Sequence, residues 1–230
     1  MSDAAKHLAR NVADTLGQTY LFAGTSAELR QRVVAGSQVR RVARAALLFE
    51  AGQPSEGLFI VLSGQVKLFA RADNGQEKVI EVVSQLGHLG ESIVFDHATH
   101  VTNARALSET VVLLVPAEVL LHELSQDPAL ATHMLMGLAR RLNAMIRDIE
   151  ALTLRSSVRR VVDYLLRAQP GQGPSATVSL PFSKSTLASL LSVTPEHFSR
   201  ILHELQSKGL IAVNRRDIHI PDTSLLAQVA

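Results

Sequence analysis

One stretch of the chain, LGHLGESIVFDHATHVTNARA at residues 86–106, combines residue types that could hold a ligand. A Gly-Glu-Ser segment at residues 90–92 precedes an apolar run, and three histidines lie around that run: His88, His97 and His100. Carboxylate, hydroxyl and imidazole groups bind polar ligands, and imidazole is also a common metal ligand. The stretch therefore predicts a binding pocket whose ligand depends on the elements that surround it.

A second pattern, in residues 194–207, suits the recognition of DNA. Its polar residues recur at the spacing of one helical face: Glu196, Ser199, Arg200 and His203. Its apolar residues lie on the opposite face: Phe198, Ile201, Leu202 and Leu205. One face can therefore pack on the domain while the other is offered outward. An Arg can donate two hydrogen bonds to guanine, a Glu can accept one from cytosine, and a Ser can serve either base.

Neighbouring residues complete the predicted DNA contacts. Thr194 can cap the helix while its hydroxyl or the exposed amides meet a phosphate. The other predicted contacts are His197 in the same helix, Lys184 and Ser185 in the preceding helix, and Arg215 in the turn that follows. The alternative is a polar face that is only solvated.

The elements around this helix follow the order of a winged helix-turn-helix. Helices are predicted at 184–191 and 195–207, and two wing strands at 210–213 and 217–220 that turn at Asn214-Arg215. Residues 140–217 carry twelve Lys/Arg and six Asp/Glu, whereas the rest of the chain carries eleven and fifteen. A basic C-terminal third on a mildly acidic body is typical of a protein that binds double-stranded DNA.

The first half of the chain has a different sequence pattern. Short helices are predicted within residues 2–34, and from about 38 to 115 short Val/Ile/Leu/Phe runs alternate with glycines. Gly52, Gly64, Gly75 and Gly87 are spaced 12, 11 and 12 residues apart, and Asp73-Asn74-Gly75 is a hairpin turn signal. This spacing predicts an antiparallel β-roll, or double-stranded β-helix.

Composition limits the function classes. A chain of 230 residues with 47% hydrophobic content can bury two cores, which predicts an α+β protein of more than one domain. The residues from Met1 to Arg10 contain no hydrophobic signal region, so we expect a cytoplasmic protein without a membrane partner. Because the chain has no cysteine, an iron–sulfur cluster held by thiolates is excluded.

Between the two halves a heptad pattern predicts a long helix of roughly 25 residues. Its apolar positions alternate in steps of four and three: Ala131, Leu135, Leu138, Leu142, Met145, Ile149 and Leu152. A stripe this regular predicts the seam of a parallel homodimer, and the alternative is a core helix that lies on its own roll. The expected division is an effector domain at 1–127, a dimerisation helix at 128–154 and a DNA-binding domain at 155–230.

Four segments together resemble the Crp/Fnr superfamily of bacterial transcription regulators, over essentially the whole chain. They are GLFIVLSGQVKLF (57–69), GQEKVIEVV (75–83), LARRLNAMIRDIEALTL (138–154) and PEHFSRIL (195–202). The E-x-x-S-R stretch at 196–200 is similar to the recognition signature of the Fnr-like branch. The resemblance implies a cyclic-nucleotide-binding-like roll, a palindrome of TTGAT-like half-sites as operator, and RNA polymerase as a partner.

The same resemblance implies an effector pocket between the roll and the long helix. Its predicted residues are Gly90, Glu91, Ser92, His100, Val101, Leu138, Met145 and Ile146. The cyclic-AMP branch has an Arg-Ser pair where this chain has His100 and Val101, and hydroxyls where it has Met145 and Ile146. Because a phosphodiester needs a fixed cation or several donors, these differences argue against cyclic AMP.

With cyclic AMP disfavoured and an iron–sulfur cluster excluded, the chain resembles the cysteine-poor regulators of denitrification and nitric-oxide responses. This resemblance implies haem b as a cofactor. The candidate axial ligands are His7, His88, His97 and His100. The alternative effector is a cyclic dinucleotide or another small ligand. For a cyclic dinucleotide, the possible ligands are arginines near the roll: Arg40, Arg41, Arg44, Arg71 and Arg105.

Two other function classes were weighed. A metal enzyme using His97 and His100 has no carboxylate at a suitable interval and leaves the winged helix unexplained, so we expect no enzyme. A cyclic-nucleotide-binding module without DNA binding leaves the basic C-terminal third unused.

Overall fold

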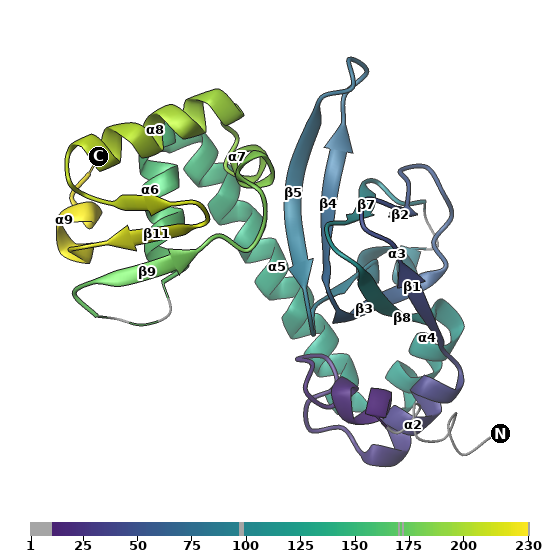
Figure 1. The fold of residues 1–230 in the computed structure, drawn as a ribbon. Helices are drawn as coiled ribbons and strands as arrows, with labels where there is room; N and C mark the ends of the chain where they lie inside the picture. The colour runs from purple at the N-terminus through teal and green to yellow at the C-terminus, as the bar shows by residue number, and fades with distance from the viewer. Residues whose placement is uncertain (1–10, 97–98, 170, 172, 230) are drawn as a thin grey trace. The chain divides into compact units, whose positions relative to one another are not determined.

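The computed structural model describes residues 11–96, 99–169, 171 and 173–229, without the side chains of Ser92, Ile93 and Asp96. The chain divides into two units, Met1–Asn143 and Ala144–Ala230 (Figure 1). Among the described residues, no helix is both long enough and apolar enough to cross a membrane.

Two antiparallel four-stranded sheets form the roll of the first unit, as predicted (Figure 1). One has the order β1 (Gln38–Val42), β8 (Thr110–Pro116), β3 (Gly57–Ser63) and β6 (His88–Leu89). The other has the order β2 (Leu47–Phe49), β7 (Asn103–Ala106), β4 (Gln65–Arg71) and β5 (Glu77–Ser84). A bulge in the β4–β5 pair, where Phe69 pairs with Val79, places one extra residue in β5.

Strand β3 is buried on both faces, which is why its sequence reads as a continuous apolar run. Phe59 and Val61 belong to the core between the two sheets. Leu58 and Ile60 belong to a second core, in which helices cover the outer face of the sheet. Successive strand residues point to opposite faces, so one short run serves both cores.

The helices of the first unit precede and follow the strands of the roll in the sequence. Residues 11–16 are helical, and α2 (Ala27–Ala35) begins where the Ser26 hydroxyl accepts a hydrogen bond from the Leu29 amide at 3.1 Å. After β8, α4 (Ala117–Gln126) packs against α2, and Arg32 bonds Glu123 at 2.7 Å. A short helix that the sequence did not predict, α3 (Glu91–Asp96), occupies the apolar run of the predicted pocket.

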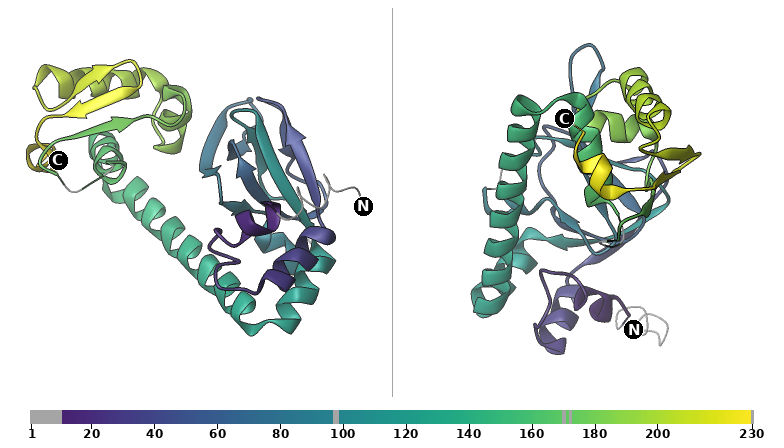
Figure 2. Two further views of the ribbon diagram at one scale, coloured as in Figure 1. Left: turned by 60° about the horizontal axis from the view of Figure 1, so that its bottom comes forward. Right: turned by 90° about the vertical axis from the view of Figure 1, so that its left-hand side faces the viewer.

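The predicted long helix is α5 (Pro128–Leu154), a continuous element that is seen best in Figure 2. The Asp127 carboxylate caps it by accepting hydrogen bonds from the amides of Ala129 and Leu130. Leu130 and Met134 are buried in the helical core of the first unit, and Leu138 packs against that core. The core-helix alternative is therefore correct for the first turns, whereas most of the heptad stripe stays exposed.

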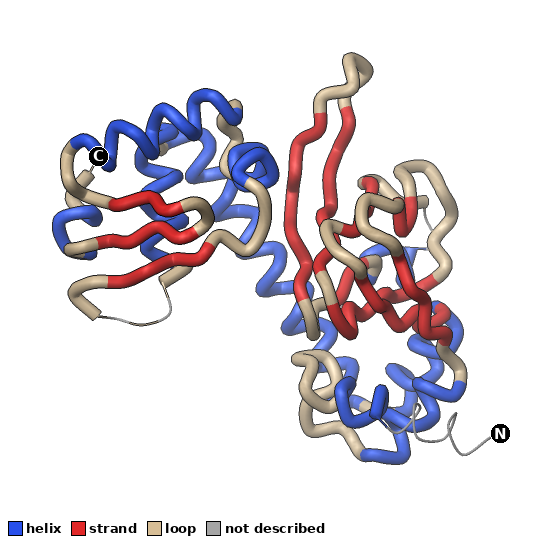
Figure 3. Tube along the Cα trace, viewed as in Figure 1, coloured by secondary structure: helices blue, strands red, loops and turns tan. Residues whose placement is uncertain are grey.

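The second unit contains α6 (Ser157–Arg167), α7 (Lys184–Leu190), α8 (Pro195–Ser207) and α9 (Thr223–Ala227). Its sheet has the order β10 (Ala212–Asn214), β11 (Asp217–Ile220) and β9 (Ala176–Ser179), shown as the three red strands beside the helices in Figure 3. The predicted wing had two strands, and β9 was missed. The turn also lies one residue later than predicted, because Asn214 pairs with Asp217 and Arg215-Arg216 form the loop.

Candidate DNA-binding face and effector domain

Helix α8 is held at its first turn by a cap and along one side by the core. The Thr194 hydroxyl accepts a hydrogen bond from the His197 amide at 3.2 Å, and Pro195 follows at a position where no amide donor is needed. The apolar face is buried in the core of the second unit: Phe198, Ile201, Leu202 and Leu205. This burial fixes which face of α8 remains outside.

The face opposite this core is exposed and polar. Its members are Glu196, Ser199, Arg200 and His203. Ser199 donates its hydroxyl to the Pro195 carbonyl at 2.9 Å, so its oxygen remains able to accept a hydrogen bond. Within the described residues Arg200 forms no ion pair, and its guanidinium stays available to a partner outside the chain.

His197 lies in α8, as predicted, and has a partner on another helix. Its Nε2 atom is 2.8 Å from the Ser157 hydroxyl of α6, and the residue is half-buried. His197 thus contacts α6 within the second unit, and its contact with DNA stays a prediction. Sequence periodicity places a residue on a helix face but does not reveal a partner on another helix.

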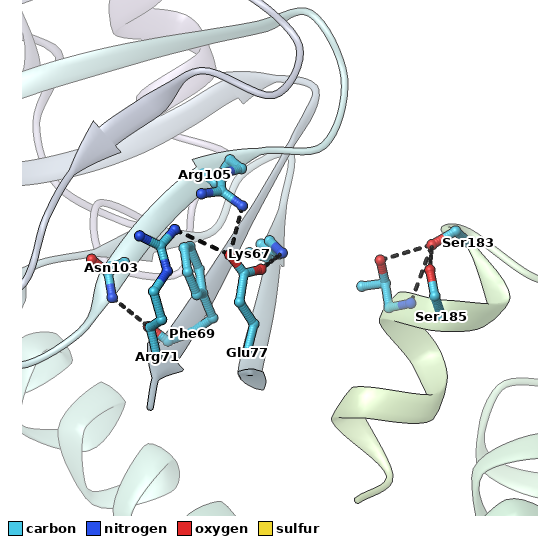
Figure 4. Close-up of polar contacts among 9 residues, drawn as sticks. Lys67, Phe69, Arg71, Glu77, Asn103, Arg105, Ser183 and Ser185 are labelled. Carbon is cyan, nitrogen blue, oxygen red and sulfur yellow. Dashed lines mark hydrogen bonds and ion pairs between the residues drawn. The ribbon is translucent and has the colours of Figure 1, made fainter. Parts of the chain in front are cut away.

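The other predicted DNA contacts are exposed. Lys184 and Ser185 lie in the first turn of α7, where the Ser183 hydroxyl accepts from the Thr186 amide at 3.1 Å and lies 2.9 Å from the Ser185 hydroxyl (Figure 4). Arg215 lies at the wing turn with a positive φ of 54°. These groups lie at the start of α7 and at the turn of the wing.

In the roll, the predicted pocket residues Gly90 and Glu91 are held tightly. Gly90 has φ 92°, and a Cβ atom there would lie 2.9 Å from the Gly57 carbonyl oxygen. Glu91 is buried, and Arg141 of α5 bonds both Glu91 and Glu81. A fixed charge pair thus connects the short helix α3 to α5.

His88 is the second neighbour of Glu91. Its Nδ1 atom lies 3.4 Å from the Glu91 carboxylate. Burial opposes ionisation of Glu91, but His88 and Arg141 together hold its pKa below the ordinary value. The carboxylate is therefore charged, and His88 is oriented toward it.

His100 is buried, and its ring stacks on Phe49 with centroids 3.6 Å apart. Its backbone amide donates to the Gln53 carbonyl at 2.9 Å, and its own carbonyl accepts from the Gly52 amide at 2.8 Å. Burial lowers the pKa of His100, which favours the neutral imidazole. The Nδ1 atom has no hydrogen-bond partner among the described residues.

The other residues of the predicted pocket are exposed, packed in the helical core or outside the described part of the chain. Val101 is 82% exposed and Met145 and Ile146 are 52% and 54% exposed, so none of the three is enclosed by this chain alone. Leu138 is half-buried in the helical core instead of facing a ligand. The Ser92 side chain, His7 and His97 lie outside what the structure describes.

A cation cluster lies on β4, β5 and β7 (Figure 4). Of its cations, the sequence predicted Arg71 and Arg105 as possible ligands but not Lys67. Lys67, Arg71 and Arg105 all bond the Glu77 carboxylate, at 2.5, 3.2 and 2.8 Å. All three cations also lie within 5.6 Å of the Phe69 ring centroid. The i, i+2 spacing of Lys67, Phe69 and Arg71 was the available sequence signal. By contrast, Arg40 is paired separately with Glu56 at 2.5 Å.

Comparisons with known proteins agree with both units. The cyclic nucleotide-binding domain model matches residues 39–127, and the Crp-like helix-turn-helix domain model matches residues 159–229. The chain is 32% identical to DNR from Pseudomonas aeruginosa, covering 94% of this chain and 96% of that one with a TM-score of 0.50. This chain belongs to the Crp/Fnr family of transcription regulators.

Two further relatives of this Crp/Fnr protein differ in their effectors. The cyclic AMP receptor protein of Thermus thermophilus is 26% identical and covers 91% of this chain and 96% of its own. The c-di-GMP responsive global regulator CLP of Xanthomonas campestris shares the fold, with a TM-score of 0.73 at 23% identity over 85% of this chain and 99% of that one. The family therefore gives this chain a DNA-binding domain and an effector-binding domain but not one effector.

Membership also decides between function classes. The matching helix-turn-helix model covers the basic third of this Crp/Fnr chain, so a binding module without DNA recognition leaves that match unexplained. Curated relatives of this chain bear the names of transcriptional regulators and activators. The protein is accordingly a DNA-binding transcription regulator.

We predict that Glu77 stabilises the fold in a pH-dependent way. Burial opposes its ionisation, but hydrogen bonds from Lys67 and Arg105 lower its pKa from 4.5 to about 2. A carboxylate whose pKa is lower in the folded state than in the unfolded state stabilises the fold. This stabilisation is complete above the pKa of the unfolded state, and it is lost as the pH falls toward the pKa of the folded state. The free energy of unfolding lost in Glu77→Gln should therefore be largest above about pH 5 and shrink toward pH 2.

Urea unfolding at several pH values measures this difference. Glu50→Gln is the matched control, because the Glu50 carboxylate forms no ion pair with the described residues. Equal losses for both variants at neutral pH would contradict the assignment.

Proposed function

We propose that the protein is a homodimeric regulator that reads a palindrome of TTGAT-like half-sites. The observation that carries this proposal is the exposed face of α8, in which Glu196, Ser199 and Arg200 stand opposite a fully packed apolar face. An α-helix of this kind fits the major groove, where Arg pairs with guanine. Two copies related by a two-fold axis would meet two half-sites one helical turn apart.

The dimer is supported by the α5 seam, defined as Leu135, Leu138, Leu142, Met145, Ile149 and Leu152. Leu142 and Ile149 are 60% and 62% exposed, and of the seam only Leu138 packs on the core of the first unit. A continuous apolar stripe of this length on a soluble helix marks a protein-protein contact. A second copy of α5 covers it in register, because heptad positions of two helices interlock.

In this proposal an effector acts through α5. The charge pair of Arg141 with Glu91 and Glu81 holds α5 against the roll, so a ligand near Glu91 biases how α5 sits. A change in α5 then alters the separation of the two recognition helices across the operator. RNA polymerase is the proposed partner at the promoter.

We propose haem as the cofactor and nitric oxide as the signal, on the resemblance to denitrification regulators and on His100. A neutral, buried imidazole with an unpartnered Nδ1 atom meets the requirement of an axial ligand. His88 is the other described candidate, although its Nδ1 atom faces Glu91. Haem, when bound, would supply an iron able to take up nitric oxide, and the His100 imidazole would hold that iron. The chain's own contribution is to hold the imidazole neutral and to exclude water from it.

A cyclic dinucleotide is the second candidate effector. The cluster of Lys67, Arg71 and Arg105 favours it, because three cations share the single carboxylate of Glu77. Guanidinium groups bind phosphodiester oxygens in a fork geometry. This ligand would lie against β4 and β7.

The first functional prediction concerns base reading. Arg200→Ala should weaken binding to each half-site by about 1–3 kcal/mol and relax the preference at the half-site guanine. Fluorescence anisotropy with single-base operator variants measures both effects. Lys208→Ala, which removes a cation from the other end of α8, should leave the base preference unchanged. Retained guanine preference in Arg200→Ala would reject this role of the residue.

The second functional prediction concerns assembly. Leu142→Glu places a carboxylate in the α5 seam, where a buried charge without a partner destabilises the dimer by several kcal/mol. Sedimentation should show monomers, and operator binding should fall in parallel. Asn143→Glu adds the same charge one residue further, off the seam, and should leave the dimer intact. A Leu142→Glu protein that remains dimeric would contradict the seam.

The third functional prediction concerns the effector. Protein reconstituted with haem should show a sharp Soret band, and the band should change or be lost in at least one alanine variant of His7, His88, His97 and His100. His122→Ala, on the exposed side of α4, is the control. A spectrum indifferent to all four substitutions would reject histidine ligation at these sites. No Soret band, together with saturable binding of cyclic di-GMP that Arg105→Gln abolishes, would support the second candidate.

A further inference from the structure

Arg160, in the first turn of α6, bonds three backbone carbonyls at once. Its Nη1 donates to the Arg155 carbonyl at 2.8 Å, its Nε to Leu191 at 3.0 Å and its Nη2 to Ser192 at 3.2 Å. None of these acceptors belongs to α6 itself. The planar guanidinium holds several donors in a fixed arrangement, so the three carbonyls are held relative to one another.

These carbonyls belong to two separate parts of the DNA-binding machinery. Arg155 directly follows the last residue of α5, and Leu191 and Ser192 form the turn between α7 and α8. Ser192 has a positive φ of 55°, and the Val193 amide donates to the Ala188 carbonyl at 3.0 Å, which closes α7 tightly. One side chain therefore joins the end of the long helix to the turn that precedes the recognition helix.

A second link joins the first turns of α6 and α8. The Ser157 hydroxyl lies 2.8 Å from His197 Nε2, in a half-buried position. The Arg155 side chain, in turn, bonds Asp163 of α6 at 2.5 Å. The segment between α5 and α6 is thus tied on both sides, and α8 is tied to the same segment.

We propose that Arg160 is a positioning residue that sets the direction of α8 relative to the end of α5, and so determines which half-site spacing the dimer accepts. The inference rests on the proposed dimer and its palindrome. The exposed face of α8 selects bases within one half-site, whereas the joint at Arg160 fixes where the second half-site must lie. Spacing and base preference are therefore controlled by different residues.

Operator spacing gives a readout that a merely structural role would not move. Inserting or deleting one base pair rotates one half-site against the other by about 35°. We would measure binding of the full-length protein to TTGAT and ATCAA half-sites separated by three, four or five base pairs. The wild-type protein should prefer one spacer clearly, and the four-base-pair spacer is expected.

In Arg160→Gln, the ratio of affinities between the preferred and the shifted spacers should fall by about fivefold or more, which corresponds to roughly 1 kcal/mol. Discrimination at the half-site guanine should stay unchanged, because the α8 face is intact. A loss of stability alone would lower affinity for all spacers by the same factor.

Arg159→Gln is the matched control. Arg159 is the adjacent arginine of α6, but it bonds Asp163 of its own helix at 2.9 Å and the carbonyls of Ala227 and Val229 near the C-terminus at 2.8 and 3.1 Å. None of these acceptors lies in the turn between α7 and α8. The variant loses the same charge and should keep the wild-type spacing ratio. Ser157→Ala removes only the second link, and it should lower the ratio in the same direction by a smaller factor.

The possible outcomes test the proposed dimer on a palindrome and the role of Arg160 separately. A wild-type protein with no spacing preference would overturn the proposed dimer on a palindrome. A wild-type preference that Arg160→Gln retains in full would overturn the role of Arg160 while leaving the proposed function intact. Thermal unfolding verifies that each variant is folded, and if Arg160→Gln is not, an unchanged ratio in Ser157→Ala overturns the joint.

Discussion

The ion pairs of Arg141 with Glu91 and Glu81 fix how the roll holds the long helix. Glu91 is 3% exposed, and a carboxylate buried to that degree is stable only with a charged or hydrogen-bonding partner. A shift of α5 by one residue would turn it by about 100° and take the guanidinium away from both carboxylates. The pairs therefore set the rotation of α5 about its axis as well as its position along it.

This rotation decides which residues of α5 remain available to a second chain. With Arg141 toward the roll, Leu130 and Met134 reach the helical core, and Leu135 and Leu142 point away from it. The core of the first unit and the exposed seam are thus two consequences of one constraint. In the proposed function, a group that competes for the Glu91 carboxylate would act on α5 through Arg141, without a separate path through the sheets.

The sequence predicted those features that depend on local periodicity. Regular glycines predicted the roll, the heptads predicted α5, and alternate faces predicted the buried and exposed sides of α8. It could not predict contacts between residues far apart in the chain, such as Arg141 with Glu81 or His197 with Ser157. Strand β9 was missed because four residues carry too little periodicity to stand out, and its pairing with β11 is long-range.

Residues 140–217 have a surplus of cations, but much of that surplus is used inside the protein: Arg141, Arg155 and Arg159 pair with carboxylates. Arg160 is occupied by backbone carbonyls. Among the described residues, the cations of the second unit without an ion pair include Lys184, Arg200, Arg215 and Arg216, which lie at the start of α7, on α8 and in the wing. These unpaired cations lie in the elements that the proposed function places at DNA, whereas Arg160 of α6 bonds backbone carbonyls in the turn before α8.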